Sequence, residues 1–256
     1  MRFVTIKLKY LAVAAAFLAL IVVSAFTAYA ADAAEAYWSG ARSLPIYSVG
    51  REDKKISISF DCAWGTEHTD AILEGLAAAN VRATFFMVQF WTEKYPEYVK
   101  KIDGAGHEIG THSATHSYMS KQSEAEIRNE LKSSSEAIKG ITGKEVTLFR
   151  PPYGDYDDLL VNTSNAMGIY PVQWDVDSLD WKDLSASDIA ARIVERVKSG
   201  SIILCHNNGL HTAEALPIVL DTLKAKGYEF VPIGELIYKE HYTIDSTGKQ
   251  IASDAS

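Results

Sequence analysis

The chain has 256 residues, of which 47% are hydrophobic and 23% are charged, and its formal net charge is −8. This acidic balance excludes a typical nucleic-acid-binding protein, which would need a basic patch or stripe. The two cysteines, Cys62 and Cys205, are too few for a disulfide-dense scaffold. The length allows one large domain with a sizeable hydrophobic core.

The N-terminal segment has the features of an export signal. Three basic residues precede an apolar run from Leu11 to Thr27, and the small-x-small site Ala28-Tyr29-Ala30 follows. This pattern predicts a signal peptide over residues 1–30. A membrane anchor is the alternative, because the run nearly reaches the ~20 residues that span a bilayer. Loss of the segment would move the formal charge from −8 to −11.

The remainder is expected to form one α/β domain over residues 55–240, between a linker or strap at 31–54 and a loose polar tail at 241–256. Alternating or continuous apolar runs predict strands at 55–60, 82–88, 107–111, 146–149, 170–176, 201–205 and 229–231. Amphipathic patterns predict helices at 70–79, 96–105, 123–140, 156–167, 187–198 and 213–226. A capping box, Ser123 with Glu126, begins the third of these helices.

Strands that alternate with helices indicate a parallel sheet covered on both faces. About seven such β-α units in one domain predict a closed or nearly closed barrel, whose chemistry lies at the carboxyl ends of the strands. Polar motifs follow the expected strands at these ends: Asp61-Cys62-Ala63-Trp64, His112-Ser113-Ala114-Thr115-His116, Arg150-Pro151-Pro152-Tyr153-Gly154, Asp177-Ser178-Leu179-Asp180-Trp181 and Cys205-His206. Together they predict a metal-assisted hydrolase site.

From about Lys55 to Tyr238, this set of motifs resembles the NodB-type polysaccharide deacetylases of carbohydrate esterase family 4. It is especially similar to the sporulation and peptidoglycan-modifying branch of spore-forming bacteria. The resemblance implies a distorted (β/α) barrel with a shallow groove. It also implies a divalent metal, with Zn²⁺ expected because His112 and His116 offer two imidazoles. Without the other motifs, each histidine would be assigned only a local hydrogen bond.

The resemblance implies a role for each remaining motif. Asp61 matches the catalytic base, and Arg150 matches the residue that keeps this carboxylate ionised. Tyr153 matches the position whose backbone N–H binds the oxyanion. His206 matches the general acid, oriented by Asp180, although Asp177 could compete for that contact. Trp181 and Leu204 match the apolar pocket for the acetyl methyl group; both could equally be ordinary core.

The first motif departs from the family pattern, Phe-Asp-Asp-Gly-Pro, because Cys62 replaces the second Asp, which is normally a metal ligand. A Cys62 thiolate could complete a Cys-His-His zinc site. It could instead be a small buried hydrophobe, which would leave only two histidines, or form a disulfide with Cys205. Trp64 stands where the family usually has Pro, and could stack on a sugar or plug the mouth of the barrel.

These features predict a secreted or membrane-anchored enzyme at the extracytoplasmic face, in the cell wall, that removes N-acetyl groups from a glycan. The expected partner is peptidoglycan or a chitooligosaccharide-like chain, with no nucleic acid and with membrane anchoring, if any, through residues 1–30. The first alternative is a metal-poor, non-catalytic glycan-binding wall protein, which the Asp-to-Cys change favours. A second alternative is cleavage of O-acetyl esters on a glycan such as xylan.

Overall fold

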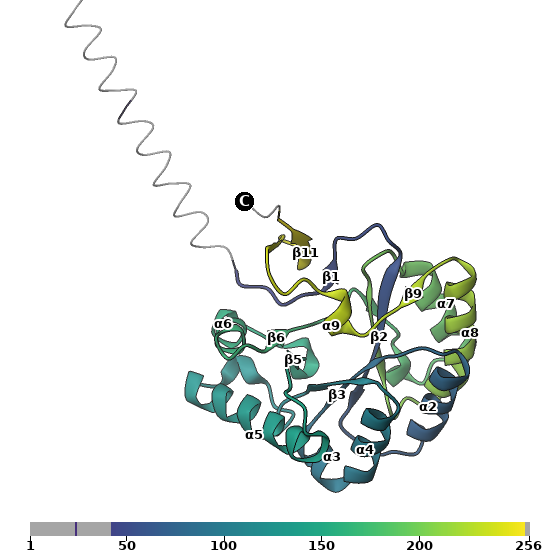
Figure 1. The fold of residues 1–256 in the computed structure, drawn as a ribbon, viewed down its shortest axis with the longest axis horizontal. Coiled ribbons are helices and arrows are strands. Elements are labelled where there is room, and N and C mark those ends of the chain that lie inside the picture. Colours follow the sequence, from purple (N-terminus) through teal and green to yellow (C-terminus); the bar gives the residue numbers. More distant parts are fainter. Residues whose placement is uncertain (1–23, 25–41, 254–256) are drawn as a thin grey trace, which may run out of the picture. The chain divides into compact units, whose positions relative to one another are not determined.

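A sheet in which every strand pair is parallel forms the centre of the domain (Figure 1). The computed structural model describes Ser24 and residues 42–253. The strand order is β6-β5-β4-β3-β2-β8-β7, and β9 also pairs with β2. The strands are β2 (Lys55–Cys62), β3 (Thr84–Met87), β4 (Glu108–Thr111), β5 (Leu148–Phe149), β6 (Tyr170–Pro171), β7 (Val176–Asp177), β8 (Ile202–His206) and β9 (Glu229–Phe230).

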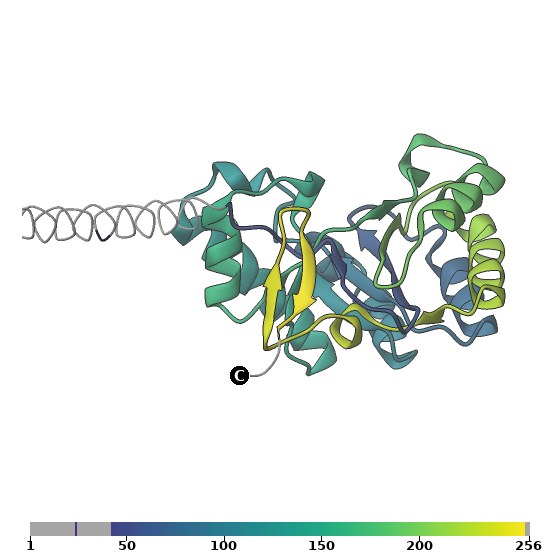
Figure 2. The same ribbon diagram turned by 90° about the horizontal axis from the view of Figure 1, so that it is seen from above.

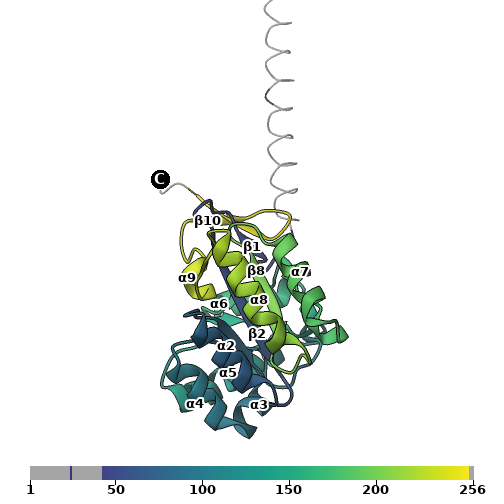
Figure 3. The same ribbon diagram turned by 90° about the vertical axis from the view of Figure 1, so that its right-hand side faces the viewer.

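Helices cover the outer face of this sheet. They are α2 (Thr69–Ala78), α3 (Gln89–Lys94), α4 (Pro96–Gly104), α5 (Glu124–Thr142), α6 (Asp158–Ala166), α7 (Ala186–Arg196), α8 (Thr212–Ala225) and α9 (Ile233–Leu236). Helix α8 packs between α7 and α2 (Figure 3), and α5 contacts α3, α4 and α6. The sheet curls into the expected distorted barrel, which confirms the predicted fold class.

The two faces of β2 differ in chemistry, as its alternating sequence requires. One face joins the largest hydrophobic cluster under the helices through Ile56, Ile58, Phe60 and Cys62. The opposite face carries Ser57, Ser59 and Asp61, all of them buried. Ser57 and Ser59 donate hydrogen bonds to the carbonyls of Val231 and Ile203, at 2.6 Å each. The polar face of the central strand is therefore inside the barrel, and Asp61 lies at its carboxyl end.

The stretch predicted as one strand at 170–176 is two strands at opposite edges of the sheet. β6 pairs with β5, whereas β7 pairs with β8. The chain crosses between the two edges in four residues, so the edges must lie near one another. Ile46, from the segment before β2, forms a parallel bridge with Val172, and Ser48 bridges Ser201. This strap, residues 46–49, lies against the two edges and nearly closes the barrel.

The helix predicted at 123–140 begins as expected but ends later. Ser123 and Glu126 form the capping box of α5, and Gly143 caps its C-terminus with a left-handed backbone. Gly140 lies inside the helix, because an exposed helical position tolerates glycine at modest cost. The other predicted helices and strands have bounds within a few residues of the observed ones, except for the divided strand, whereas the short helices α3 and α9 were not predicted.

Residues 242–252 form a hairpin within the stretch 241–256 for which a loose tail was predicted. β10 (Tyr242–Ile244) and β11 (Lys249–Ala252) form an antiparallel hairpin, and β11 pairs with β1 (Ser48–Val49) (Figure 2). Buried Gln250 exchanges two hydrogen bonds with the backbone of Tyr238, at 2.7 Å and 2.6 Å. The prediction failed because this polar sequence is ordered by hydrogen bonds to distant backbone, which composition does not reveal.

The predicted signal peptide or anchor, residues 1–30, lies outside the described residues apart from Ser24. In the part of the chain that is described, none of the helices has the length and apolar character needed to cross a membrane.

The strap yields a stability prediction at Gly200. Its φ is +81°, and a Cβ there would lie 1.7 Å from the Val49 carbonyl oxygen. We expect Gly200→Ala to lower the unfolding free energy by more than about 3 kcal/mol, because left-handed strain adds to a backbone clash. Gly143→Ala is the matched control: its φ is +72°, but no described atom lies within 4 Å of its Cβ. It should lose about 1 kcal/mol in urea denaturation, and equal losses in both variants would refute the clash.

Candidate active site

The carboxyl ends of the strands meet around a pocket of about 500 Å³. The pocket is lined by Asp61, Ala63, Trp64, His112, His116, Tyr153, Trp174, Asp177, Trp181, Leu204, His206 and Asn208. Arg150 and Asp180 lie directly behind this lining and contact Asp61 and His206. The structure thus brings together every site residue predicted from the sequence except Cys62.

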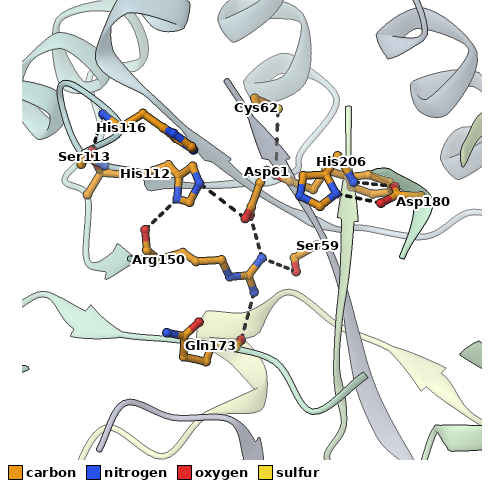
Figure 4. Close-up of polar contacts among 12 residues, drawn as sticks. Ser59, Asp61, Cys62, His112, Ser113, His116, Arg150, Gln173, Asp180 and His206 are labelled. Carbon is orange, nitrogen blue, oxygen red and sulfur yellow. Dashed lines mark hydrogen bonds and ion pairs between the residues drawn. The ribbon is translucent and has the colours of Figure 1, made fainter. Parts of the chain in front are cut away.

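Arg150 forms a buried ion pair with Asp61 (Figure 4). Its guanidinium, fully shielded from solvent, donates to Asp61 Oδ1 at 2.8 Å, to Ser59 Oγ at 2.9 Å and to the Gln173 carbonyl at 3.1 Å. Burial raises the pKa of the Asp61 carboxyl, but the charge of Arg150 lowers it, and the net pKa is below its ordinary value. Asp61 is therefore an ionised carboxylate at the pocket wall.

His112 is held in one tautomer by the backbone of Arg150. Its Nδ1 lies 2.7 Å from the Arg150 carbonyl oxygen, which can only accept, so Nδ1 carries the proton. The Nε2 lone pair then faces Asp61 Oδ2 at 3.6 Å, beyond hydrogen-bond distance. Burial lowers the pKa of His112, which keeps the imidazole neutral. This is the state in which a histidine can bind a metal ion.

His116 lies beside His112, with ring centroids 4.9 Å apart. Burial, and next the neighbouring His112, lower the pKa of His116 to about 4. Its buried Nδ1 has no hydrogen-bond partner among the described residues. Trp64 and Tyr153 contact the ring edge-on, at 4.8 Å and 4.6 Å between centroids. His116 is thus a second neutral imidazole, enclosed by aromatic rings.

Glu130, which the sequence reasoning missed, holds the loop that carries both histidines. From α5 its carboxylate accepts from the backbone N–H groups of Ala114 and Thr115, at 2.8 Å and 2.9 Å, and from Thr115 Oγ1 at 2.8 Å. The sequence contains a signal for it. Glu130 follows Ile127 by three residues and precedes Leu131, so a charged group occupies the buried face of the helix.

The opposite side of the pocket carries a His-Asp pair. His206 Nδ1 lies 2.7 Å from Asp180 Oδ1, while Asp180 Oδ2 accepts from the His206 backbone N–H at 2.8 Å and from Thr212 Oγ1 at 2.6 Å. Burial lowers the pKa of His206, but its hydrogen bond to Asp180 and that group's charge raise it, to a net value above normal. Asp177, the competing candidate, instead accepts from the Leu179 N–H.

Trp181 and Leu204, the residues predicted to contact the acetyl methyl group, line the active-site pocket together with Tyr153. Leu204 is buried, on β8 next to His206, whereas Trp181 and Tyr153 are 57% and 55% exposed. Neither aromatic side chain is therefore ordinary core. The backbone of Tyr153 has a φ of +60°, and Ser113, His116 and Leu179 have similar positive φ values. Strained backbone of this kind, outside glycine, is concentrated in loops that form functional sites.

Cys62 is not part of this pocket. Its side chain lies on the opposite face of β2 from Asp61, in the hydrophobic cluster, and its Sγ contacts the Phe60 carbonyl. Burial raises the pKa of the Cys62 thiol well above its usual value, so the thiolate that would bind a metal is disfavoured. Both cysteines of the described domain, Cys62 and Cys205, are free thiols, so the alternative of a disulfide is not observed.

These donors do not fit the three-ligand zinc site implied by the resemblance. No group of three or more His, Cys, Asp or Glu side chains that could hold a metal ion occurs in the described part of the chain. His112 and His116 offer two neutral imidazoles, one with an unpartnered buried nitrogen. The position of the third ligand, Cys62, faces the core.

Comparisons with known proteins agree with this fold. Residues 48–172 match the family model described as polysaccharide deacetylase. A peptidoglycan-N-acetylglucosamine deacetylase of Bacillus cereus is 34% identical over 200 residues, which cover 76% of this chain and 93% of that protein. The peptidoglycan-N-acetylglucosamine deacetylase PgdA of Listeria monocytogenes is 33% identical over 84% of this chain. The match spans only 44% of PgdA, less than half its length.

Among solved structures, a carbohydrate esterase family 4 pseudoenzyme from Bacillus anthracis has a TM-score of 0.74 and 32% identity, covering 77% of this chain and 70% of that chain. A mutant of that protein, described as having restored enzymatic activity, is 34% identical with the same TM-score, covering 77% and 72%. This chain is thus similar both to proteins named as deacetylases and to one described as a pseudoenzyme.

The orientation of Cys62 predicts how the pocket responds to zinc. In calorimetric titrations with Zn²⁺, Cys62→Ala should retain the wild-type affinity within about twofold, because Sγ lies outside the pocket. His116→Ala should weaken binding by at least about tenfold, because it removes one of two imidazoles. Parallel losses in both variants would contradict the geometry, since they would require the thiol to turn into the pocket.

Proposed function

Because the chain belongs to the polysaccharide deacetylase family, we propose that it removes N-acetyl groups from cell-wall glycan. The main support for this proposal is that one pocket contains both an ionised carboxylate and a histidine that favours its protonated form. Asp61, kept ionised by Arg150, faces His206, whose proton is stabilised by Asp180. Amide hydrolysis needs one group that accepts a proton and one that donates a proton, and these two side chains can serve as that base and that acid.

In the proposed reaction, Asp61 takes a proton from a water molecule as its oxygen attacks the acetamide carbonyl carbon. The new C–O bond gives a tetrahedral intermediate whose negative oxygen the Tyr153 backbone N–H would stabilise. His206 then gives its proton to the nitrogen as the C–N bond breaks. The products are a free amine on the sugar and acetic acid, which ionises to acetate by losing its proton to solvent. Transfer of a proton from Asp61 to His206 through solvent restores both groups. Trp181 and Leu204 would contain the methyl group during these steps.

Peptidoglycan is the proposed substrate, and N-acetylglucosamine the proposed sugar. The support is that relatives from Bacillus cereus and Listeria monocytogenes are both named peptidoglycan-N-acetylglucosamine deacetylases. Such a substrate places the site of action outside the cytoplasm, at the cell wall. This agrees with the export signal expected over residues 1–30.

The proposed reaction has no step that requires a divalent ion. Zn²⁺ bound in a family site would polarise the carbonyl and acidify the water. Here His112 and His116 would be its protein ligands, and two such ligands fall short of the usual three. The two proton transfers of the proposed reaction depend on Asp61 and His206 alone.

The second candidate function is a non-catalytic glycan-binding wall protein. The incomplete set of metal ligands favours it, as does similarity to a structure described as a pseudoenzyme. The two candidates differ in a measurable way: the enzyme releases acetate from peptidoglycan, and the binder retains affinity for the glycan without releasing any.

Acetate release from purified peptidoglycan tests the proposed roles, with Zn²⁺ added or chelated. We expect Asp61→Asn and His206→Ala each to lower the rate by about 10²–10⁴-fold, as loss of a positioned base or acid does. His211→Ala is the matched control, because His211 is a half-buried histidine outside the pocket lining. Urea denaturation checks that each variant is folded. Wild-type rates in both site variants would exclude these roles, and no release by folded wild-type protein would favour the binder.

The His206–Asp180 pair also predicts a pH dependence. Asp180 raises the pKa of His206, so activity should persist above the ordinary histidine pKa and fall as pH rises through the raised value. Asp180→Asn removes the charge that stabilises the imidazolium. The alkaline limb of the kcat/KM profile should therefore shift to lower pH by about one unit or more. An unchanged limb would show that another group is the acid.

A further inference from the structure

An Asn-Gly pair follows strand β8 at the active-site pocket. Asn208 is the one asparagine of the chain that precedes a glycine. It is exposed, it lines the pocket together with His206, and its side chain forms no hydrogen bond with another described residue. Asparagine is a thermolabile residue, and a following glycine leaves its side-chain carbon open to the next backbone nitrogen. The asparagine best placed to react therefore borders the proposed acid.

Packing behind the pocket requires glycine at position 209. A Cβ on Gly209 would lie 2.2 Å from Thr212 Oγ1 and 2.9 Å from Asp180 Oδ2. Both atoms belong to the hydrogen-bonded group that holds His206, because Thr212 and the His206 backbone N–H donate to Asp180 Oδ2. A larger residue would displace that carboxylate. The contacts of Asp180 thus keep the least hindered residue directly after Asn208.

The Gly209 nitrogen is only weakly engaged in a hydrogen bond. Its N–H donates to the His206 carbonyl at 3.4 Å, which is longer than the usual range for such bonds. The preceding Asn207 is held differently: it is fully buried, and its side-chain amide donates to the Gly65 carbonyl at 2.8 Å. The turn is therefore anchored at Asn207, whereas the side chain of Asn208 is not restrained.

We propose that Asn208 is a site of spontaneous deamidation in the folded protein, with water as the only co-reactant. The Gly209 nitrogen attacks Asn208 Cγ, which forms a C–N bond and closes a five-membered succinimide ring. The bond from Cγ to the side-chain nitrogen breaks, and that nitrogen leaves as ammonia with the proton of the Gly209 amide. One water molecule then opens the ring at either carbonyl and gives aspartate or isoaspartate at position 208. Nothing is oxidised or reduced.

Both products alter the pocket. Aspartate adds a negative charge to a lining that already contains Asp61 and Asp177 and no lysine or arginine of the described chain. Isoaspartate also lengthens the backbone by one carbon between positions 208 and 209, next to the close approach of Gly209 to Asp180. On the premise of the proposed deacetylase function, the first change holds the proton of His206 more tightly, and the second displaces its carboxylate partner. Deamidation should therefore lower the rate of acetate release.

Mass spectrometry of the full chain tests the site. Folded wild-type protein is held at neutral and at alkaline pH, and peptide mapping locates any gain of about 1 Da, the difference between an amide and an acid. We expect the gain at Asn208, and a faster gain at alkaline pH, because the attacking nitrogen must lose its proton. Asn208→Gln should abolish it over the same period, because the longer side chain cannot close a five-membered ring. Asn165→Gln is the matched control, since Asn165 is also exposed but precedes Ala166, and this variant should gain mass at Asn208 as fast as wild-type protein.

Acetate release and the His206 ring report the effect on the pocket. Release by wild-type protein should fall as the modified fraction rises, while Asn208→Gln keeps its own starting rate. If wild-type protein releases no acetate, the proposed reaction fails, but the mass gain still decides the site. A raised pKa of His206 in NMR titrations of the modified protein then decides the effect of the added charge.

Other outcomes would overturn the proposal. No gain at Asn208, or a gain only in urea-unfolded protein, would show that the folded turn prevents the attack. An equally fast gain at Asn165 would contradict the role of Gly209. Undiminished acetate release by fully modified protein, or an unchanged pKa of His206 in that protein, would refute the effect on the pocket.

Discussion

The arrangement of the pocket depends on one buried residue, Arg150. Its guanidinium is fully shielded from water, lies 4.2 Å from the Phe86 ring centroid and pairs with Asp61. Burial lowers the pKa of Arg150, yet an arginine side chain remains protonated in a protein, so the interior must supply a negative charge. Asp61 supplies it and is therefore held ionised. The backbone carbonyl of the same residue fixes the tautomer of His112. One residue thus sets the charge state of the proposed base and the orientation of the neighbouring imidazole.

Histidines in the same pocket differ in protonation because their partners differ. His112 donates to a neutral carbonyl, His116 has aromatic neighbours, and burial lowers the pKa of both. His206 is buried too, but a carboxylate accepts from its Nδ1 and raises its pKa. The fold therefore places neutral imidazoles on the Asp61 side and a stabilised imidazolium on the Asp180 side. The local hydrogen-bond partners therefore determine which histidines are neutral and which one is protonated.

The sequence predicted that the site lies at the strand ends. Buried parallel strands appear in a sequence as apolar runs, and the polar residues that follow them, such as Asp61 and His206, are easy to recognise. It also contained the orientation of Cys62: the alternation that predicted the strand through Ile56, Ile58 and Phe60 assigns residue 62 to the same apolar face. The family pattern, which has a metal-binding Asp at this position, instead suggested that Cys62 could be a ligand. The division of 170–176 between two sheet edges was not predictable in the same way. It depends on closure of the barrel and on the strap at Ile46, which are contacts between distant segments.

Two buried pairs, Arg150 with Asp61 and His206 with Asp180, favour the deacetylase over the non-catalytic glycan-binding protein on energetic grounds. Replacing a buried ion pair with well-packed hydrophobic residues is often neutral or stabilising, so stability alone does not explain Arg150 and Asp61. A protein that only bound glycan would need exposed aromatic side chains, which are separate from these pairs. It would gain nothing from a second carboxylate that raises the pKa of His206. The loss of the third ligand position alters how strongly a metal could bind, whereas both proton-transfer groups keep the partners that set their charge. The pocket is therefore better explained as a hydrolytic site with a weakened metal position than as a binding site that happens to contain an acid and a base.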